Sequence, residues 1–154
     1  VVEKPPREHP KRPIHGLGCR KSEVSGRRLW GLMRERFVYP DAFFRDHFTE
    51  NYCPLVFMEE SGKNLTPDKL YKEDREALFT VCDTHIRRVV ETLSPDFLIG
   101  IGKFAEKRMQ PLFEHFSHLE ILSIPHPSPA NPQANRGWAK LAIEKLTSTG
   151  VWEL

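Results

Sequence analysis

The residues with the clearest chemical interest lie in the segment 126–137, which reads HPSPANPQANRG and follows an apolar run at 119–125. Its three prolines fix φ and remove backbone donors, so the segment is rigid and cannot extend a sheet. A rigid wedge of small residues suits insertion beside an extruded nucleotide, and His126 at its base can hydrogen-bond a substrate atom. The alternative is a proline-rich loop with a structurally satisfied histidine.

A second candidate is Asn51, which we place at the end of a strand-like stretch over 44–51, before a loop at Cys53-Pro54. A side-chain amide donates and accepts at once, and this suits the reading of a nucleobase edge. The alternative is an asparagine that satisfies the backbone of its own loop.

Two further stretches could approach phosphates. Lys103 opens a helix after the Gly102 turn, where backbone N–H groups and a cation can meet an anion. The run Ser25-Gly26-Arg27-Arg28 combines small residues with two guanidinium groups. Tight packing at Gly102 and a solvated basic helix face at 25–28 are the respective alternatives.

The elements that must position these residues alternate between helix and strand. Apolar spacing predicts helices over 22–39, with Ser22 or Ser25 as cap, and over 66–92, with Thr66 as N-cap and Pro67 first. Strands are predicted at 97–101 and 119–125, and helices from 103 and over 135–148. This alternation favours a three-layer α/β/α fold with a short, mostly parallel sheet, in which sites form at the carboxyl ends of strands.

Composition limits the remaining classes. The 154 residues suit one domain, with a polar, proline-rich segment at 1–13. The net charge of +2 argues against a histone-like binder but allows a local basic face. Three scattered cysteines favour reduced thiols, and His115 and His118 lack the companions of a zinc site. We expect no metal, no cofactor and no membrane span, and the absence of G-x-S-x-G argues against an α/β hydrolase.

Four stretches, HPKRP…SEVSG, ENYCPLVF, SGKNLTP and HPSPANPQANRGW, occur in this order along the chain. Together they resemble the single-strand-selective monofunctional branch of the uracil-DNA glycosylase superfamily. The resemblance implies a DNA-repair enzyme that excises uracil, and oxidised uracils, from single- and double-stranded DNA. It also implies a nuclear, monomeric protein without a cofactor.

The resemblance assigns roles to individual residues. His126 would be catalytic, donating a hydrogen bond to uracil O2, and Asn51 would read the uracil amide edge, so both should converge on one pocket sized for a pyrimidine. Ser25, Gly26 and Lys103 would contact the DNA backbone. The remaining DNA contacts would come from the backbone-pinching residues Pro127, Ser128 and Pro129 and from the wedge residues Ala130, Asn131, Pro132, Gln133, Ala134, Asn135, Arg136 and Gly137.

Two departures from the family pattern are visible. The family's first motif, a G-M-N-P-G-P-like segment that positions the attacking water and belongs to a central strand, does not occur in these 154 residues. Ala130 stands where the family's wedge usually carries an arginine, and Arg136 is nearby. The alternative to an active glycosylase is therefore a truncated form that binds DNA but is catalytically impaired.

Overall fold

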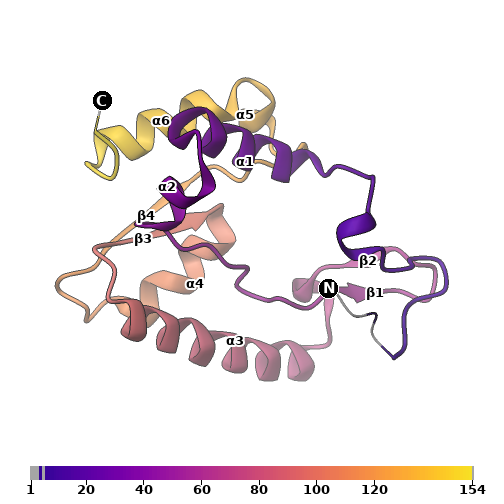
Figure 1. Cartoon of the computed structure of the whole chain (residues 1–154). Helices are drawn as coiled ribbons and strands as arrows, with labels where there is room; N and C mark the ends of the chain where they lie inside the picture. The colour runs from indigo at the N-terminus through magenta and orange to yellow at the C-terminus, as the bar shows by residue number, and fades with distance from the viewer. Residues whose placement is uncertain (1–3, 5, 154) are drawn as a thin grey trace.

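The computed structural model describes residue 4 and residues 6–153 of the chain (Figure 1). Its regular elements are helices and short strands, which alternate strictly only from α3 to α5. In chain order they are η1 (Gly16–Gly18), α1 (Val24–Phe37), α2 (Pro40–Phe44), β1 (Phe57–Met58), β2 (Asn64–Leu65), η2 (Pro67–Lys69), α3 (Lys72–Leu93), β3 (Phe97–Ile101), α4 (Lys103–Phe113), β4 (Glu120–Ile124), α5 (Pro132–Asn135) and α6 (Trp138–Ser148).

The centre of the fold is the parallel pair β3 and β4, in register from Phe97 opposite Glu120 to Ile101 opposite Ile124. Alternate residues of both strands face opposite sides of this sheet. On one side Leu122 and Ile124 pack against α1 and α6, and on the other Leu98 and Ile121 pack against α3 and α4. Helices thus cover both faces, as Figure 1 shows, and the predicted layered α/β class is confirmed.

The predictions for 97–101, for the helix from Lys103 and for a strand within 119–125 are confirmed. Helix α1 is also as expected, but its cap is the Glu23 carboxylate, which accepts the Gly26 N–H at 3.2 Å, rather than Ser22 or Ser25.

The predicted strand over 44–51 is wrong. Pro40 does not merely end α1 but starts a new helix, α2, since a proline at the first helical position loses no intrahelical hydrogen bond. The Phe43 ring stacks on His47 at 4.6 Å, and His47 Nδ1 bonds the Phe43 carbonyl at 3.0 Å. Residues 45–56 contain no strand, so Asn51 lies in irregular backbone rather than at a strand end.

Two helix boundaries also differ from the prediction. Thr66 precedes a short 3-10 turn at Pro67–Lys69, without a side-chain cap, and the long helix begins only at Lys72. The final helix begins at Trp138, because Gly137 at φ 124 separates it from the short α5. Between α2 and η2, β2 pairs antiparallel with β1, a hairpin that the sequence pattern did not predict.

Candidate active site

The segment after β4 is tied together by its own asparagine and serine side chains. Asn131 Nδ2 donates to the His126 carbonyl at 3.0 Å, and Asn135 Nδ2 donates to the Pro129 carbonyl at 2.8 Å. The Ser128 hydroxyl accepts the Ala130 N–H at 3.2 Å. Because proline-rich backbone has few donors, these side chains supply the bonds that a helix or sheet would otherwise make.

Two helices hold this segment from outside. Arg28 of α1 donates to the Pro127 carbonyl at 2.8 Å and to Asn135 Oδ1 at 3.0 Å. The buried Trp138 of α6 donates its indole N–H to the Pro125 carbonyl at 2.6 Å. Arg28 therefore stabilises the segment 126–137. The sequence had suggested either a phosphate contact or a solvated basic helix face for the run 25–28.

The hydrogen bonds of His126 fix which ring nitrogen carries the proton. The Ser128 backbone N–H donates to His126 Nδ1 at 3.1 Å. A nitrogen that accepts cannot carry a proton, so in the neutral ring the proton is on Nε2. The side chain is exposed, and no hydrogen bond of the described residues involves Nε2. His126 thus presents a neutral N–H donor at the end of β4.

Gly102 lets His126 approach the start of α4 closely. A Cβ at Gly102 would lie 2.9 Å from His126 Cβ, and the backbone there has φ +95, which L side chains rarely adopt. The Gly102 N–H bonds the Ile124 carbonyl at 2.8 Å, joining the ends of the two strands. Lys103, the first residue of α4, is exposed directly beside this contact, and no side chain caps that helix end.

The start of α1 places a carboxylate near the same end of the sheet. A hydrogen bond with Ser25 lowers the pKa of Glu23, burial opposes this, and the amides of Gly26 and Ser25 lower it further. The carboxylate therefore stays ionised at the N-terminus of α1, where the helix dipole stabilises it. Since Glu23 occupies the Gly26 N–H, that amide reaches a phosphate only if Glu23 moves away.

The residues of the segment 127–137 differ in their exposure to solvent. Pro129, Ala130, Pro132, Gln133, Asn135, Arg136 and Gly137 are exposed, and Ser128 and Asn131 are half-buried. Pro127 is buried, and Ala134, with 2% of its surface exposed, belongs to the core around Trp138. The side chains available to a ligand are therefore those on the outer surface of the segment, with Ala130 among them.

Asn51 is exposed, and in the part of the chain that the structure describes its side chain makes no hydrogen bond. Its two neighbours are fixed instead. Glu50 bonds His85 of α3 at 3.1 Å, and the Tyr52 hydroxyl donates to Asp83 of the same helix at 2.7 Å. The amide of Asn51 therefore projects from a segment held on both sides.

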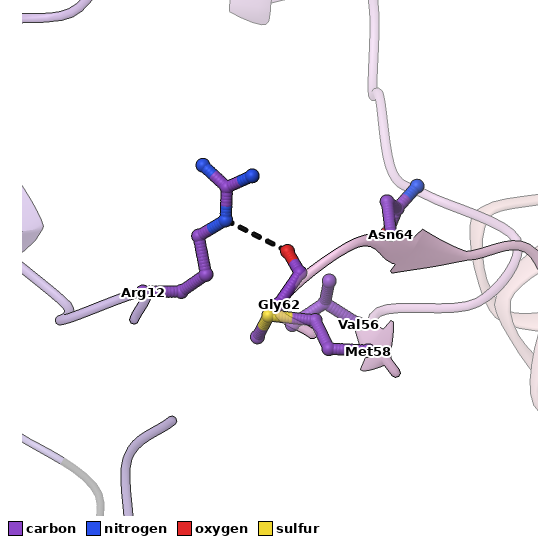
Figure 2. Close-up of a pocket in the computed structure, with 5 residues that line it drawn as sticks. All are labelled: Arg12, Val56, Met58, Gly62 and Asn64. Atoms are coloured by element: carbon purple, nitrogen blue, oxygen red, sulfur yellow. Dashed lines mark hydrogen bonds between the residues drawn. The ribbon is translucent and has the colours of Figure 1, made fainter. Parts of the chain in front are cut away.

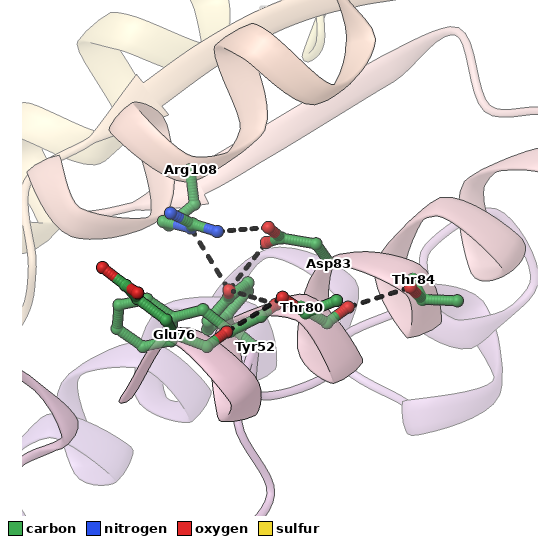
Figure 3. A network of polar contacts seen from close by, with 7 residues as sticks. Tyr52, Glu76, Thr80, Asp83, Thr84 and Arg108 are labelled. Carbon is green, nitrogen blue, oxygen red and sulfur yellow. Dashed lines mark hydrogen bonds and ion pairs between the residues drawn. The ribbon is translucent and has the colours of Figure 1, made fainter. Parts of the chain in front are cut away.

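Tyr52 belongs to a polar cluster that sequence reasoning missed (Figure 3). Arg108 of α4 donates through Nε to the Tyr52 hydroxyl at 3.2 Å and forms an ion pair with Asp83. Burial, followed by the hydrogen bond to Asp83, raises the pKa of Tyr52 well above its usual range, so the phenol stays protonated and donates. No local pattern could have revealed this cluster, because its members are separated by 25 to 56 residues.

His126 and Asn51 are linked through the first turn of α4. His126 contacts Gly102, and the Tyr52 ring meets the Phe104 ring edge-on at 5.4 Å. No hydrogen bond among the described residues joins the two candidate side chains directly. Their convergence on one pocket stays a prediction.

The two pockets that stand out on the surface lie elsewhere. One, of about 210 Å³, lies between the N-terminal segment and the β1–β2 hairpin, where Arg12 donates to the Gly62 carbonyl at 2.8 Å (Figure 2). The other, of about 300 Å³, lies beside Trp152. Neither includes Asn51 or His126, and neither brings together groups that suggest a reaction.

Among residues 4 and 6–153, no three histidine, cysteine, aspartate or glutamate side chains are gathered as a metal ion requires. Over the same residues no helix has the length and apolar character needed to cross a bilayer.

Comparison with known proteins identifies the class. The model of the uracil DNA glycosylase superfamily matches residues 12–147, so this chain belongs to that superfamily. The chain is 43% identical over 154 residues to a single-strand selective monofunctional uracil DNA glycosylase of Bos taurus, covering 99% of this chain and 57% of the relative.

The same protein of Rattus norvegicus is 43% identical over 154 residues, covering 99% of this chain and 55% of the relative. That of Mus musculus is 42% identical over 151 residues, covering 97% and 54% respectively. The chain thus spans a little over half the length of the curated relatives that it matches. The predicted family resemblance is confirmed.

Proposed function

We propose that this protein is a DNA-repair glycosylase that excises uracil, and oxidised derivatives of uracil, from single- and double-stranded DNA. Membership of the uracil DNA glycosylase superfamily and similarity to mammalian single-strand selective monofunctional uracil DNA glycosylases support this proposal. The single observation that carries it is the hydrogen bond of His126: Nδ1 accepts the Ser128 amide N–H at 3.1 Å, which leaves Nε2 of the exposed ring as the nitrogen that can donate to a ligand.

The reaction breaks the bond between C1′ of the sugar and N1 of uracil. Its electron pair goes to the base, so negative charge develops on uracil O2 while the sugar becomes oxocarbenium-like. The Nε2–H of His126 stabilises that charge as it forms, and water then supplies hydroxide to C1′ and a proton to the base. A fixed neutral donor suits this role, because its proton stays on the ring throughout.

Asn51 supplies selection in this proposal. Its amide accepts from uracil N3–H and donates to O4, whereas cytosine offers the opposite pattern at these positions. A polar group left unpaired in the closed site costs about 1–3 kcal/mol, which corresponds to roughly one to two decades of discrimination.

DNA is held, in this proposal, by the outer surface of the segment 126–137 and by the start of α4. The stiff backbone enters the space left by the extruded base, where its rigidity limits the entropy lost on binding. Lys103 and the uncapped amides of α4 meet a phosphate, and Arg136 adds an exposed cation. Ala130 fills little of the vacated stack, so double-stranded DNA should be a poorer substrate than single-stranded DNA.

The test uses the full natural polypeptide that carries these residues and an oligonucleotide with one uracil. Alkali after incubation breaks the strand wherever the base has been removed. His126→Leu is expected to lower turnover by about 10²–10³-fold, as loss of one such donor does. His115→Leu, at an exposed histidine after α4, is the matched control and should keep full turnover. Binding of the oligonucleotide without scission would leave a DNA-binding module and overturn the proposal.

The proposal includes a monomeric protein that acts in the nucleus, where its substrate lies. Light scattering of the purified protein at micromolar concentration tests the first point, and immunostaining of cells tests the second. A stable dimer or a purely cytoplasmic signal would contradict them.

A further inference from the structure

The cluster of Tyr52, Asp83 and Arg108 has no part in the reaction proposed above, yet its bonds are numerous for a region near the surface (Figure 3). The Tyr52 hydroxyl has a single proton and two possible acceptors, Asp83 Oδ1 at 2.7 Å and the Phe79 carbonyl at 3.3 Å. The shorter contact, to a carboxylate, takes the proton. The hydroxyl oxygen then accepts from Arg108, so Tyr52 is bonded as donor and as acceptor.

Aromatic rings shield this cluster from water. The Arg108 guanidinium lies over the Phe79 ring at 4.8 Å and the Tyr52 ring at 5.8 Å, and Phe104 packs edge-on against Tyr52. Only 30% of the Arg108 side chain and 20% of the Asp83 side chain are exposed. Partial removal of water strengthens the bonds, and it makes the loss of any one partner costly.

The cluster lies next to Asn51 in the chain. Tyr52 directly follows Asn51, and Glu50, on the other side, bonds His85. Residues 45–56 form no β-sheet hydrogen bonds. The side chains of Glu50 and Tyr52 therefore hold the Asn51 backbone against α3 and α4. Without these anchoring bonds, the irregular segment would have to become ordered each time it binds DNA, and this loss of entropy would weaken binding.

We propose that Tyr52, Asp83 and Arg108 are positioning residues that hold the Asn51 amide in the orientation needed to select uracil. This inference rests on the proposed function of Asn51. It assigns to the three residues no contact with the base. Their effect is specificity through preorganisation: a displaced amide meets uracil and cytosine almost equally well, since neither can then form both hydrogen bonds.

The experiment measures the ratio of affinities for two oligonucleotides, again with the full natural polypeptide. One carries a 2′-fluoro uracil nucleotide, whose glycosidic bond resists hydrolysis, and the other carries its 2′-fluoro cytosine counterpart. Tyr52→Phe keeps the ring and removes the hydroxyl, and we expect it to lower the ratio about 10-fold. Tyr71→Phe removes a hydroxyl from a tyrosine that is 86% exposed and should leave the ratio unchanged.

Backbone order parameters from nuclear magnetic relaxation give a second readout that does not depend on DNA. The order parameters of 49–53 should fall in Tyr52→Phe, because the side-chain bonds that anchor this segment are lost, whereas those of β3 should be unaffected. If Tyr52→Phe fails to fold, Asp83→Asn, which keeps the shape but removes the charge, serves for both measurements. A loss of overall stability alone lowers the active fraction without changing the affinity ratio.

The outcomes separate the two proposals. If the parent protein does not prefer uracil, the proposed function is wrong, and the positioning role falls with it. If the parent prefers uracil and Tyr52→Phe keeps the full ratio, the proposed function stands and the positioning role is wrong. Unchanged order parameters at 49–53 would likewise overturn the anchoring.

Discussion

The segment that carries His126 and the segment that carries Asn51 are both irregular backbone, but they are held in different ways. Around His126 most bonds are short-range: Ser128 to His126, Asn131 to His126 and Asn135 to Pro129 span two to six residues. Around Asn51 the bonds run to distant helices, with separations of 31 and 35 residues to α3 and 56 from Tyr52 to Arg108.

This difference determines how the stability of each region responds to substitutions. Short-range bonds between neutral groups are largely independent, so one can be lost while the others keep the segment stiff, and the prolines restrict it further. In the Tyr52 cluster each group depends on the others, since an unpaired Asp83 or Arg108 leaves a partly buried charge. We therefore expect small, additive effects near His126 and larger, coupled effects near Asn51.

The largest effect is expected where the two regions meet, at Gly102. In Gly102→Ala the new Cβ would lie 2.9 Å from His126 Cβ, and φ +95 adds backbone strain of about 1–3 kcal/mol. Displacement of His126 by ~1 Å should lower turnover about 10²-fold. Urea unfolding and the alkaline scission assay measure the two effects. Gly31→Ala, in a helix with open space around it, should keep turnover intact.

The next largest effect compares the two regions directly. Asp83→Ala removes the acceptor of Tyr52 and the counter-charge of Arg108, and it should lower the free energy of unfolding by about 2–3 kcal/mol. Asn131→Ala removes two local bonds, to the His126 carbonyl and from the Gln133 N–H, and should cost only about 1 kcal/mol.

Double-mutant cycles distinguish a coupled network from independent bonds. Tyr52→Phe combined with Asp83→Ala should be strongly non-additive, whereas Asn131→Ala combined with an alanine at Asn135 should be nearly additive. Equal coupling in both pairs would remove the contrast between the regions.

The His126 side of the site could be predicted from the sequence, because its structure depends on neighbours along the chain. The apolar run at 119–125 predicted β4, Gly102 predicted the turn into α4, and the prolines predicted that the sheet does not continue into 126–137. Even there, the short helix α5 and the clamp by Arg28 were missed, since Arg28 lies 99 residues from Pro127 in the chain.

The Asn51 side was predicted incorrectly because local pattern carries little information there. Loose alternation over 44–51 suggested a strand, but Phe43, Phe37 and His47 pack as an aromatic group around α2 instead. The partners of Tyr52 are an aspartate and an arginine on helices, residue types that usually face solvent. Only a three-dimensional structure reveals that they meet.

A smaller effect tests whether Arg28 serves the protein or the DNA. Arg28→Gln should loosen the segment 126–137 and lower stability by about 1–2 kcal/mol, since two bonds to the guanidinium are lost. If Arg28 makes no phosphate contact, the slope of log affinity against log salt stays the same. If it does, the slope should decrease in magnitude by about 0.9. Arg27→Gln is the matched control, because exposed Arg27 bonds only the Ser22 carbonyl among the residues that the structure describes.

The smallest effect is a pH dependence that belongs to the Asn51 region. Burial, with Cys53 alongside, raises the pKa of the Cys82 thiol to about 11. Between pH 9 and 11 the unfolded thiol has lost its proton while the folded one keeps it, so the folded state binds more protons and stability falls as pH rises.

The slope from this single thiol is at most about 1.4 kcal/mol per pH unit, and partial exposure of the region lowers it. Urea unfolding at pH 8, 9 and 10 measures it. Cys82→Ala should flatten the dependence, whereas Cys19→Ala, at an exposed cysteine, should leave it unchanged. Tyr52→Phe should flatten it only near pH 10 and above, where an unfolded phenol loses its proton and the folded one keeps it. A dependence between pH 8 and 10 that survives both Cys82→Ala and Tyr52→Phe would place the titrating group outside the Asn51 region.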